Sequence, residues 1–157
     1  MSRITVTHRH GESFDVRVRG YALISDEPVT LGGDDEGPTP TELVVAGLAA
    51  CTADETVRSL AASGAGFQPV EVEADFSWDP NGSRVKQVRL SIKMPADTPR
   101  DSVDAVMESA LRCPARKMLT EPPTIEYQVP GFAIGLAGRR DGGSWRVQPL
   151  PGADSKS

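Results

Sequence analysis

Residues 37–60 read GPTPTELVVAGLAACTADETVRSL, and this stretch decides the fold. Thr39 is the expected N-cap of a helix with Pro40 at its first position, where a missing N–H costs nothing. Glu42 follows Thr39 at the spacing of a capping box, and its charge suits the positive end of a helix. In the apolar run that comes next, Thr52 is the only polar residue. A helix that is apolar all round is buried, so we expect this helix at the centre of the fold.

The expected helix carries Cys51, one of the two cysteines in the chain. Its helix face also carries Val44, Gly47, Leu48 and Glu55 by the three-and-four spacing, which predicts that Cys51 lies in the buried half. The other cysteine, Cys113, lies in ALRCPARKML, where Pro114 interrupts an amphipathic helix. Free cysteine often packs as a small hydrophobe, so position alone allows either inert core residues or reactive thiols.

Composition narrows the class of protein. The net charge of −5 argues against a general nucleic-acid surface. No apolar run reaches the roughly 18–20 residues that span a bilayer. The first residues, MSRITVTHRH, lack the apolar core of a signal peptide, so we expect a cytoplasmic protein with no membrane segment. Thiols stay reduced in that compartment, so two cysteines favour a redox or catalytic role, or inert core, over a structural disulfide.

The rest of the chain predicts an α+β fold with antiparallel sheets. Alternating apolar residues predict a three-strand meander followed, after the cysteine helix, by a strand pair with a bulge near Lys86 and Gln87. A second helix is expected after Thr98, and a last strand over residues 125–129. The predicted domains are 1–130 for the main fold, 131–150 for an extension that suggests a hairpin, and 151–157 for a disordered tail.

Two cysteine motifs, GPTPTELVVAGLAAC and CPARKML, and the loop ISDEPVTLGGDDEGPTP resemble the OsmC/Ohr family of thiol peroxidases. The match is to the branch with the pattern GPsPxELLLAALGAC and covers about residues 2 to 130. The resemblance implies an OsmC-like α+β fold, in which the antiparallel sheets of an intertwined homodimer wrap around central, buried, cysteine-bearing helices. Its active sites would lie at the dimer interface.

The resemblance also implies a reaction, the reduction of organic hydroperoxides in an oxidative stress response. Cys51 would be the peroxidatic residue that becomes a sulfenic acid, and Cys113 the resolving residue that condenses with it to a disulfide. A dithiol such as a lipoyl group would then reduce the disulfide. Neither a cofactor nor a metal is implied.

A peroxidatic thiolate needs positive charge nearby, because burial alone raises the pKa of a thiol. Peroxidase members of the family use an N-terminal arginine held by a glutamate. Arg9 matches that arginine best, with Arg17 and Arg19 as alternatives. The glutamate directly follows the motif proline in those members, but here that position is Thr41 and Glu42 comes one residue later, about 100° around the helix. Glu42 is therefore expected either to hold the arginine or only to stabilise the helix start.

Three alternatives remain open. The first is a non-catalytic OsmC-like module that binds a small apolar ligand at the dimer interface, which the Thr41 departure favours. The second is a purely structural dimer with no pocket beside Cys51. The third is a metal site built from His8, His10, Cys51 and Cys113, although neither cysteine belongs to a close-spaced ligand pair.

Overall fold

The computed structural model describes residues 3–64, 69–130, 132–135 and 146–149, with side chains as far as residue 130. The chain divides into two compact units, residues 1–120 and 121–157. The first unit is an α+β fold with antiparallel sheets, as the sequence predicted. Its elements are β1 (Ile4–His10), β2 (Ser13–Val18), β3 (Tyr21–Ser25), η1 (Val29–Leu31), α1 (Pro40–Ala62), β4 (Glu71–Trp78), β5 (Val85–Lys93), α2 (Arg100–Arg112) and α3 (Pro114–Thr120).

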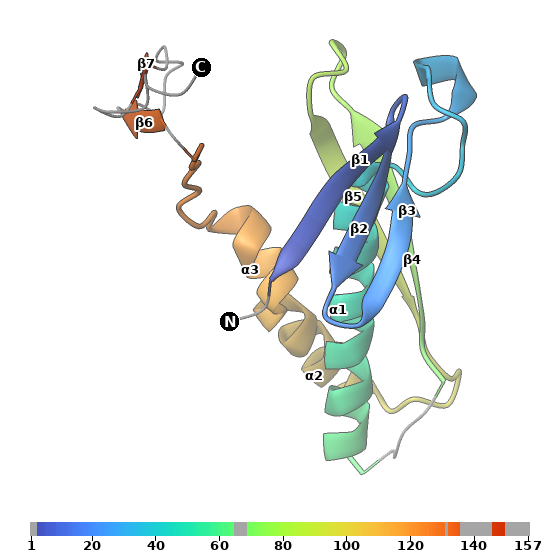
Figure 1. Ribbon diagram of the computed structural model, residues 1–157. Coiled ribbons are helices and arrows are strands. Elements are labelled where there is room, and N and C mark those ends of the chain that lie inside the picture. The colour runs from blue at the N-terminus through green and yellow to red at the C-terminus, as the bar shows by residue number, and fades with distance from the viewer. Residues whose placement is uncertain (1–2, 65–68, 131, 136–145, 150–157) are drawn as a thin grey trace. The chain divides into compact units, whose positions relative to one another are not determined.

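Helix α1 is the longest element of the first unit, and two further helices and the β4–β5 pair contact it (Figure 1). It begins as predicted: the Thr39 side chain accepts the N–H of Glu42 at 3.2 Å, and the Glu42 carboxylate accepts the N–H of Thr39 at 2.8 Å. Together with Pro40 at the first position, these two bonds form a complete capping box. The helix runs for 23 residues and packs against α2, α3, β4 and β5.

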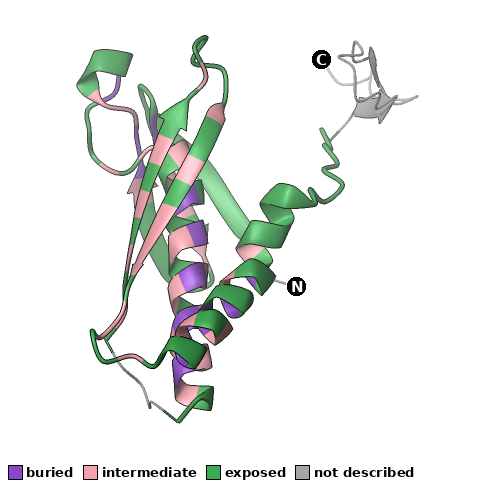
Figure 2. Ribbon diagram, turned by 180° about the vertical axis from the view of Figure 1, so that it is seen from behind, coloured by how far each residue is buried: buried purple, intermediate pink, exposed green. Residues whose placement is uncertain are grey.

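The buried face of α1 differs from the predicted one. The residues buried within one chain are Val45, Leu48, Thr52, Thr56 and Leu60, and Figure 2 shows them as a purple stripe. Val44, expected inside, is 52% exposed. An apolar run without periodicity does not say which side faces the core, so the packing of neighbouring elements decided it. The two buried threonines fit because each hydroxyl donates to the carbonyl four residues earlier.

The two sheets have the predicted antiparallel order. Strands β1, β2 and β3 form a meander, and β4 pairs with β5. The predicted bulge in β5 is confirmed: the register passes from Gln87 to Val85, so Lys86 is the extra residue. A second irregularity lies in β1, where the register passes from His8 to His10 and leaves Arg9 unpaired in the ladder.

The loop that connects the meander to α1 is held by hydrogen bonds to Asp26, which is 1% exposed. The Asp26 carboxylate accepts the backbone N–H groups of Glu27, Asp34 and Glu36 at 2.8 to 3.1 Å. Burial alone would raise the pKa of Asp26, but these three donors outweigh burial and lower it. The Asp26 N–H donates to the carbonyl of Pro38 at 3.3 Å, which ties the end of the loop to the meander.

The second unit contains β6 (Phe132–Gly135) and β7 (Arg146–Pro149), which pair antiparallel. The strand predicted over residues 125–129 is wrong: residues 122–128 have no strand, and Val129 makes only an isolated bridge. Alternation of apolar residues gives a strand only where a neighbouring strand supplies hydrogen bonds. The predicted domain boundary at residue 130 stays a prediction, and the predicted disordered tail, 151–157, lies outside the described residues.

Candidate functional site

The structure brings the two cysteine side chains close enough for each to shift the pKa of the other. Cys51 lies near the middle of α1, and Cys113 lies in the turn between α2 and α3. Pro114 cannot continue α2, so the chain leaves the helical conformation at Cys113 and starts α3 at Pro114. Both thiols are free, Cys51 half-buried and Cys113 fully buried. Two free thiols that lie this near each other are candidates for oxidation to a disulfide.

The Cys51 thiol has a pKa above its ordinary value. Burial contributes most, and the hydrogen bond to Cys113 comes next. The backbone N–H of Ala115 lowers the pKa, but the negative charges of Cys113 and Glu55 raise it again. Within a single chain, Cys51 therefore holds its proton.

The Cys113 thiol has a lowered pKa, although burial, the largest influence, raises it. Interactions with four groups outweigh burial: the Cys51 thiol, the backbone N–H groups of Arg116 and Ala115, and the Thr52 hydroxyl. These interactions therefore favour a negative charge on Cys113 over one on Cys51.

Glu55 lies one helical turn beyond Cys51 and is turned towards α2. Ser109, a buried residue of α2, donates to the Glu55 carboxylate at 2.9 Å and contacts the Glu55 carbonyl at 3.3 Å. Asp54 points elsewhere, because its carboxylate pairs with Arg58 at 3.0 Å on the exposed side. Of these two acids, only Glu55 contributes to the raised pKa of Cys51.

Arg9 and Glu42 are not paired with each other within one chain. The Arg9 guanidinium pairs with the Glu36 carboxylate at 2.5 Å and donates to the Ser13 hydroxyl at 3.2 Å. The bulge in β1 aims Arg9 at this loop acid. Glu42 is occupied by the capping box with Thr39. The catalytic roles expected for Arg9 and Glu42 remain predictions.

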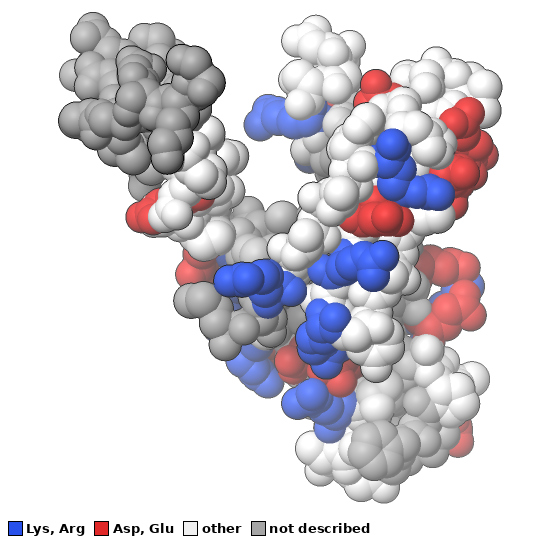
Figure 3. All heavy atoms as spheres, in the orientation of Figure 1, with Lys and Arg blue, Asp and Glu red and all other residues white. Residues whose placement is uncertain are grey.

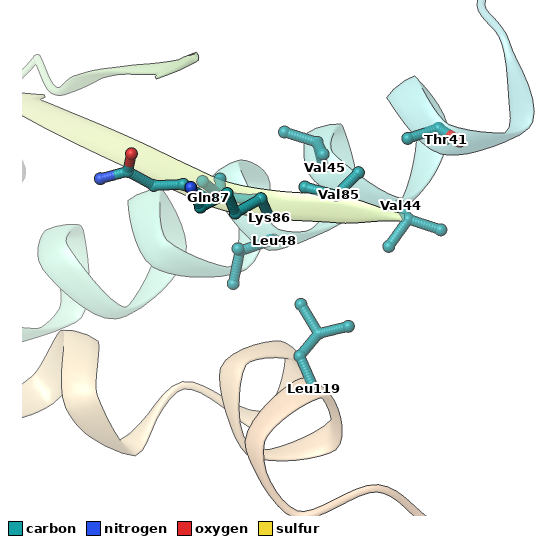
Figure 4. A pocket seen from close by; sticks show the side chains of 9 residues that line it. Thr41, Val44, Val45, Leu48, Val85, Lys86, Gln87 and Leu119 are labelled. Carbon is teal, nitrogen blue, oxygen red and sulfur yellow. The ribbon is translucent and has the colours of Figure 1, made fainter. Parts of the chain in front are cut away.

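An apolar pocket of about 280 Å³ lies along α1, towards its N-terminus from Cys51. Leu119 of α3 faces Val44, Val45 and Leu48 across this pocket (Figure 4), and residues 85–88 of β5 complete its wall. The lining also includes Thr41, the position at which the peroxidase pattern has glutamate. A mainly aliphatic wall with few polar groups suits a small apolar ligand.

The described residues offer no group of three or more His, Cys, Asp or Glu side chains that could hold a metal ion. The histidines lie apart from the thiol pair: the His8 ring contacts the carbonyl of Gly11 at 3.1 Å, and His10 lies near Asp34 and Glu36. The metal-site alternative is therefore not formed within one chain. Among the described helices, none is long and apolar enough to cross a bilayer. On the face in Figure 3, acidic and basic side chains are both present.

Neither the interaction between Thr52 and Cys113 nor the Glu55–Ser109 bond was predicted from the sequence. One signal for Thr52 was available. Thr52 and Thr56 are spaced by four residues on a mainly apolar helix, which is the arrangement in which buried hydroxyls donate to carbonyls of the preceding turn. The bond from Ser109 to Glu55 joins two helices far apart in sequence, and no local pattern indicates it.

The helices, the antiparallel sheets and the two free thiols define an α+β protein with a neighbouring pair of cysteines. The family model of OsmC-like proteins matches residues 33–128. The chain therefore belongs to the OsmC-like protein family. No curated protein matches the chain.

Solved structures share this fold at low identity. A candidate osmotic stress induced and detoxification response protein from Psychrobacter arcticus 273-4 is 22% identical, with a TM-score of 0.66 over 74% of this chain and 87% of that one. An OsmC-like protein from Mycoplasma pneumoniae is 17% identical, with a TM-score of 0.64 over 78% and 89% of the two chains. The organic hydroperoxide resistance protein OhrB of Bacillus subtilis is 18% identical, with a TM-score of 0.55 over 78% and 92%.

Proposed function

We propose that this protein is a thiol-dependent peroxidase that reduces organic hydroperoxides, with Cys51 as the peroxidatic and Cys113 as the resolving cysteine. The observation that carries the proposal is the proximity of the two thiols, which shift each other's pKa. Cys51 is the more accessible of the two and lies on the helix that lines the apolar pocket. Among the structural neighbours, OhrB is an organic hydroperoxide resistance protein, which agrees with this substrate class.

The reaction has two balanced steps. The Cys51 thiolate attacks the outer oxygen of ROOH; the S–O bond forms, the O–O bond breaks, and the alkoxide takes a proton to leave as ROH. The Cys113 thiolate then attacks the sulfenic sulfur, and hydroxide leaves as water after taking a proton, which yields the Cys51–Cys113 disulfide. A dithiol such as a lipoyl group restores both thiols. The proposed location is the cytoplasm, which keeps the thiols reduced between cycles.

The raised pKa of Cys51 in a single chain requires a source of positive charge during catalysis. We assign this role to Arg9 of a second copy in an intertwined homodimer, whereas Glu42 stays in the capping box with Thr39. A dimer is supported by large apolar side chains that one chain leaves exposed: Ile4, Val6, Tyr21, Leu23, Val44, Met107, Leu111, Met118 and Leu119. Light scattering after gel filtration tests it, and a stable monomer at micromolar concentration would exclude a shared site.

The alternative function is a non-catalytic module that binds a small apolar ligand. Two observations favour it: Thr41 stands in the pocket wall, and the Glu55 charge opposes ionisation of Cys51. In that case the thiols would react slowly, and the pocket would bind an apolar probe equally well when both cysteines are replaced by serine.

The deciding experiment is intact-mass analysis with peptide mapping after a small excess of cumene hydroperoxide. The wild type should form a Cys51–Cys113 disulfide quickly, and Cys113→Ser should accumulate sulfenic or over-oxidised Cys51. Cys51→Ser is the matched control and should consume no peroxide. If both thiols stay reduced, or oxidise no faster than free cysteine, the peroxidase proposal is wrong and the binding module is favoured.

A further inference from the structure

The two sulfurs of the thiol pair differ in how far a reductant can reach them. Cys113 is 0% exposed, and this burial is complete within one chain, so assembly cannot increase its access. Cys51 is only half-buried. Reduction of a disulfide begins with in-line attack by a thiolate on one of the two sulfur atoms. Access therefore favours attack on Cys51.

The two sulfurs also differ in how well they would hold a negative charge. The backbone N–H groups of Ala115 and Arg116 and the hydroxyl of Thr52 all lower the pKa of Cys113. Of these groups, only the Ala115 N–H lowers the pKa of Cys51, which also lies near the Glu55 carboxylate. Thr52 is 2% exposed. Its hydroxyl lies 2.9 Å from the carbonyl of Leu48 and can turn its single proton from that oxygen to a thiolate on Cys113.

We propose that a small dithiol reduces the Cys51–Cys113 disulfide by attacking Sγ of Cys51, that Sγ of Cys113 is the leaving thiolate, and that Thr52 stabilises it. The proposal rests on the proposed function only for the presence of this disulfide in the cycle. It adds the direction of reduction and a role for Thr52.

The exchange is balanced in atoms and electrons. The thiolate of the dithiol forms a bond to Sγ of Cys51, the Cys51–Cys113 bond breaks, and its electron pair stays on Sγ of Cys113. The second thiol of the reductant loses its proton and attacks the reductant's first sulfur, which is bonded to Cys51 in the mixed disulfide. This attack releases Cys51 as a thiolate, which takes up a proton. The protein disulfide gains two electrons, and the dithiol becomes a cyclic disulfide.

The test forms the disulfide with diamide, so it does not depend on peroxide chemistry. The oxidised protein is treated briefly with 2-mercaptoethanol, quenched with N-ethylmaleimide, and mapped by mass spectrometry. The adduct should be on Cys51 and maleimide on Cys113, with at least about a tenfold preference. The same disulfide opened in urea is the control and should lose most of this preference. A majority of adduct on Cys113, or no disulfide with diamide, would overturn the proposal.

Thr52 has a matched control in Thr56, which is also buried and also donates to the carbonyl four residues earlier, but is not among the donors to Cys113. Thr52→Val should slow reduction of the disulfide by dithiothreitol about threefold, because one hydrogen bond to the leaving thiolate is lost. Thr56→Val should lose about as much stability as Thr52→Val but should leave the rate of disulfide reduction unchanged. Equal rates in the two variants would remove Thr52 from the mechanism.

These outcomes separate the two proposals. If cumene hydroperoxide leaves Cys51 reduced, the peroxidase proposal fails, but the disulfide made by diamide still reports which sulfur is attacked. If the peroxide forms the disulfide and the adduct maps to Cys113, the peroxidase proposal stands and the direction of reduction is wrong.

Discussion

The capping box at the start of α1 offers the sharpest test of what Glu42 does. Thr39→Ala removes the oxygen that accepts the Glu42 N–H at 3.2 Å and leaves one helix donor without a partner. Glu42→Gln keeps an oxygen that can accept the N–H of Thr39, so the second bond of the box persists. Glu42→Ala removes that bond. Comparison of the three variants therefore gives the contribution of each hydrogen bond of the capping box separately.

The expected magnitudes follow from the geometry of the box. Thr39→Ala should lower the free energy of unfolding by about 1 kcal/mol, the usual cost of losing an N-cap. For a chain of this size this corresponds to a fall in Tm of about 2–4 °C. Glu42→Ala should cost about as much as one net hydrogen bond, about 0.5–1.5 kcal/mol. Glu42→Gln should cost only about 0.3–1 kcal/mol, for the lost interaction of its charge with the helix dipole.

Activity should change little in Glu42→Gln. Cys51 lies about three turns beyond the cap. The buried residues Val45 and Leu48 fix the part of the helix that lies between the cap and Cys51. Urea unfolding followed by circular dichroism gives the stabilities, and initial rates with cumene hydroperoxide give the activities. A loss of activity of about tenfold or more in Glu42→Gln, with its stability kept, would refute this reasoning and show that Glu42 holds an arginine in the assembled protein. A cost below about 0.3 kcal/mol for Thr39→Ala would mean that the box does not form.

Three further predictions concern the scaffold. Leu60→Ala should cost about 2–5 kcal/mol in urea unfolding, because Leu60 is 1% exposed; a cost below about 1 kcal/mol would contradict its burial. Gly37→Ala should greatly lower the yield of folded protein, since its Cβ would lie 2.3 Å from the carbonyl oxygen of Ile24; Gly20→Ala, with nothing within 4 Å, is the control and should fold normally. The lowered pKa of Asp26 means that its stabilisation is complete above its unfolded pKa, about 3.9, and is lost as the pH falls through the folded value. In Asp26→Asn, the free energy of unfolding should therefore fall less steeply as the pH is lowered into the acid range. An unchanged dependence on pH would contradict the three hydrogen bonds to the Asp26 carboxylate.

Local signals predicted the elements that depend on neighbours in the chain. The cap residues Thr39, Pro40 and Glu42 predicted the start of α1, because capping is decided within four residues. Alternation predicted the meander and the β4–β5 pair, and the missed alternation at Lys86 predicted the bulge. The same kind of signal failed over residues 125–129, because alternation says which side chains share a face but not whether a partner strand is present.

The sequence by itself determined the family and the α+β class. It also limited any thiol chemistry of the site to two distinctive motifs, because the chain has no cysteine outside them. Only the tertiary structure decided the face of α1 that is buried, the burial of Cys113 but not Cys51, and the contact of Thr52 with Cys113. The reason is physical. Capping and periodicity depend on bonds and spacings along the chain, whereas burial and pKa values depend on donors, charges and excluded water that other elements supply through space.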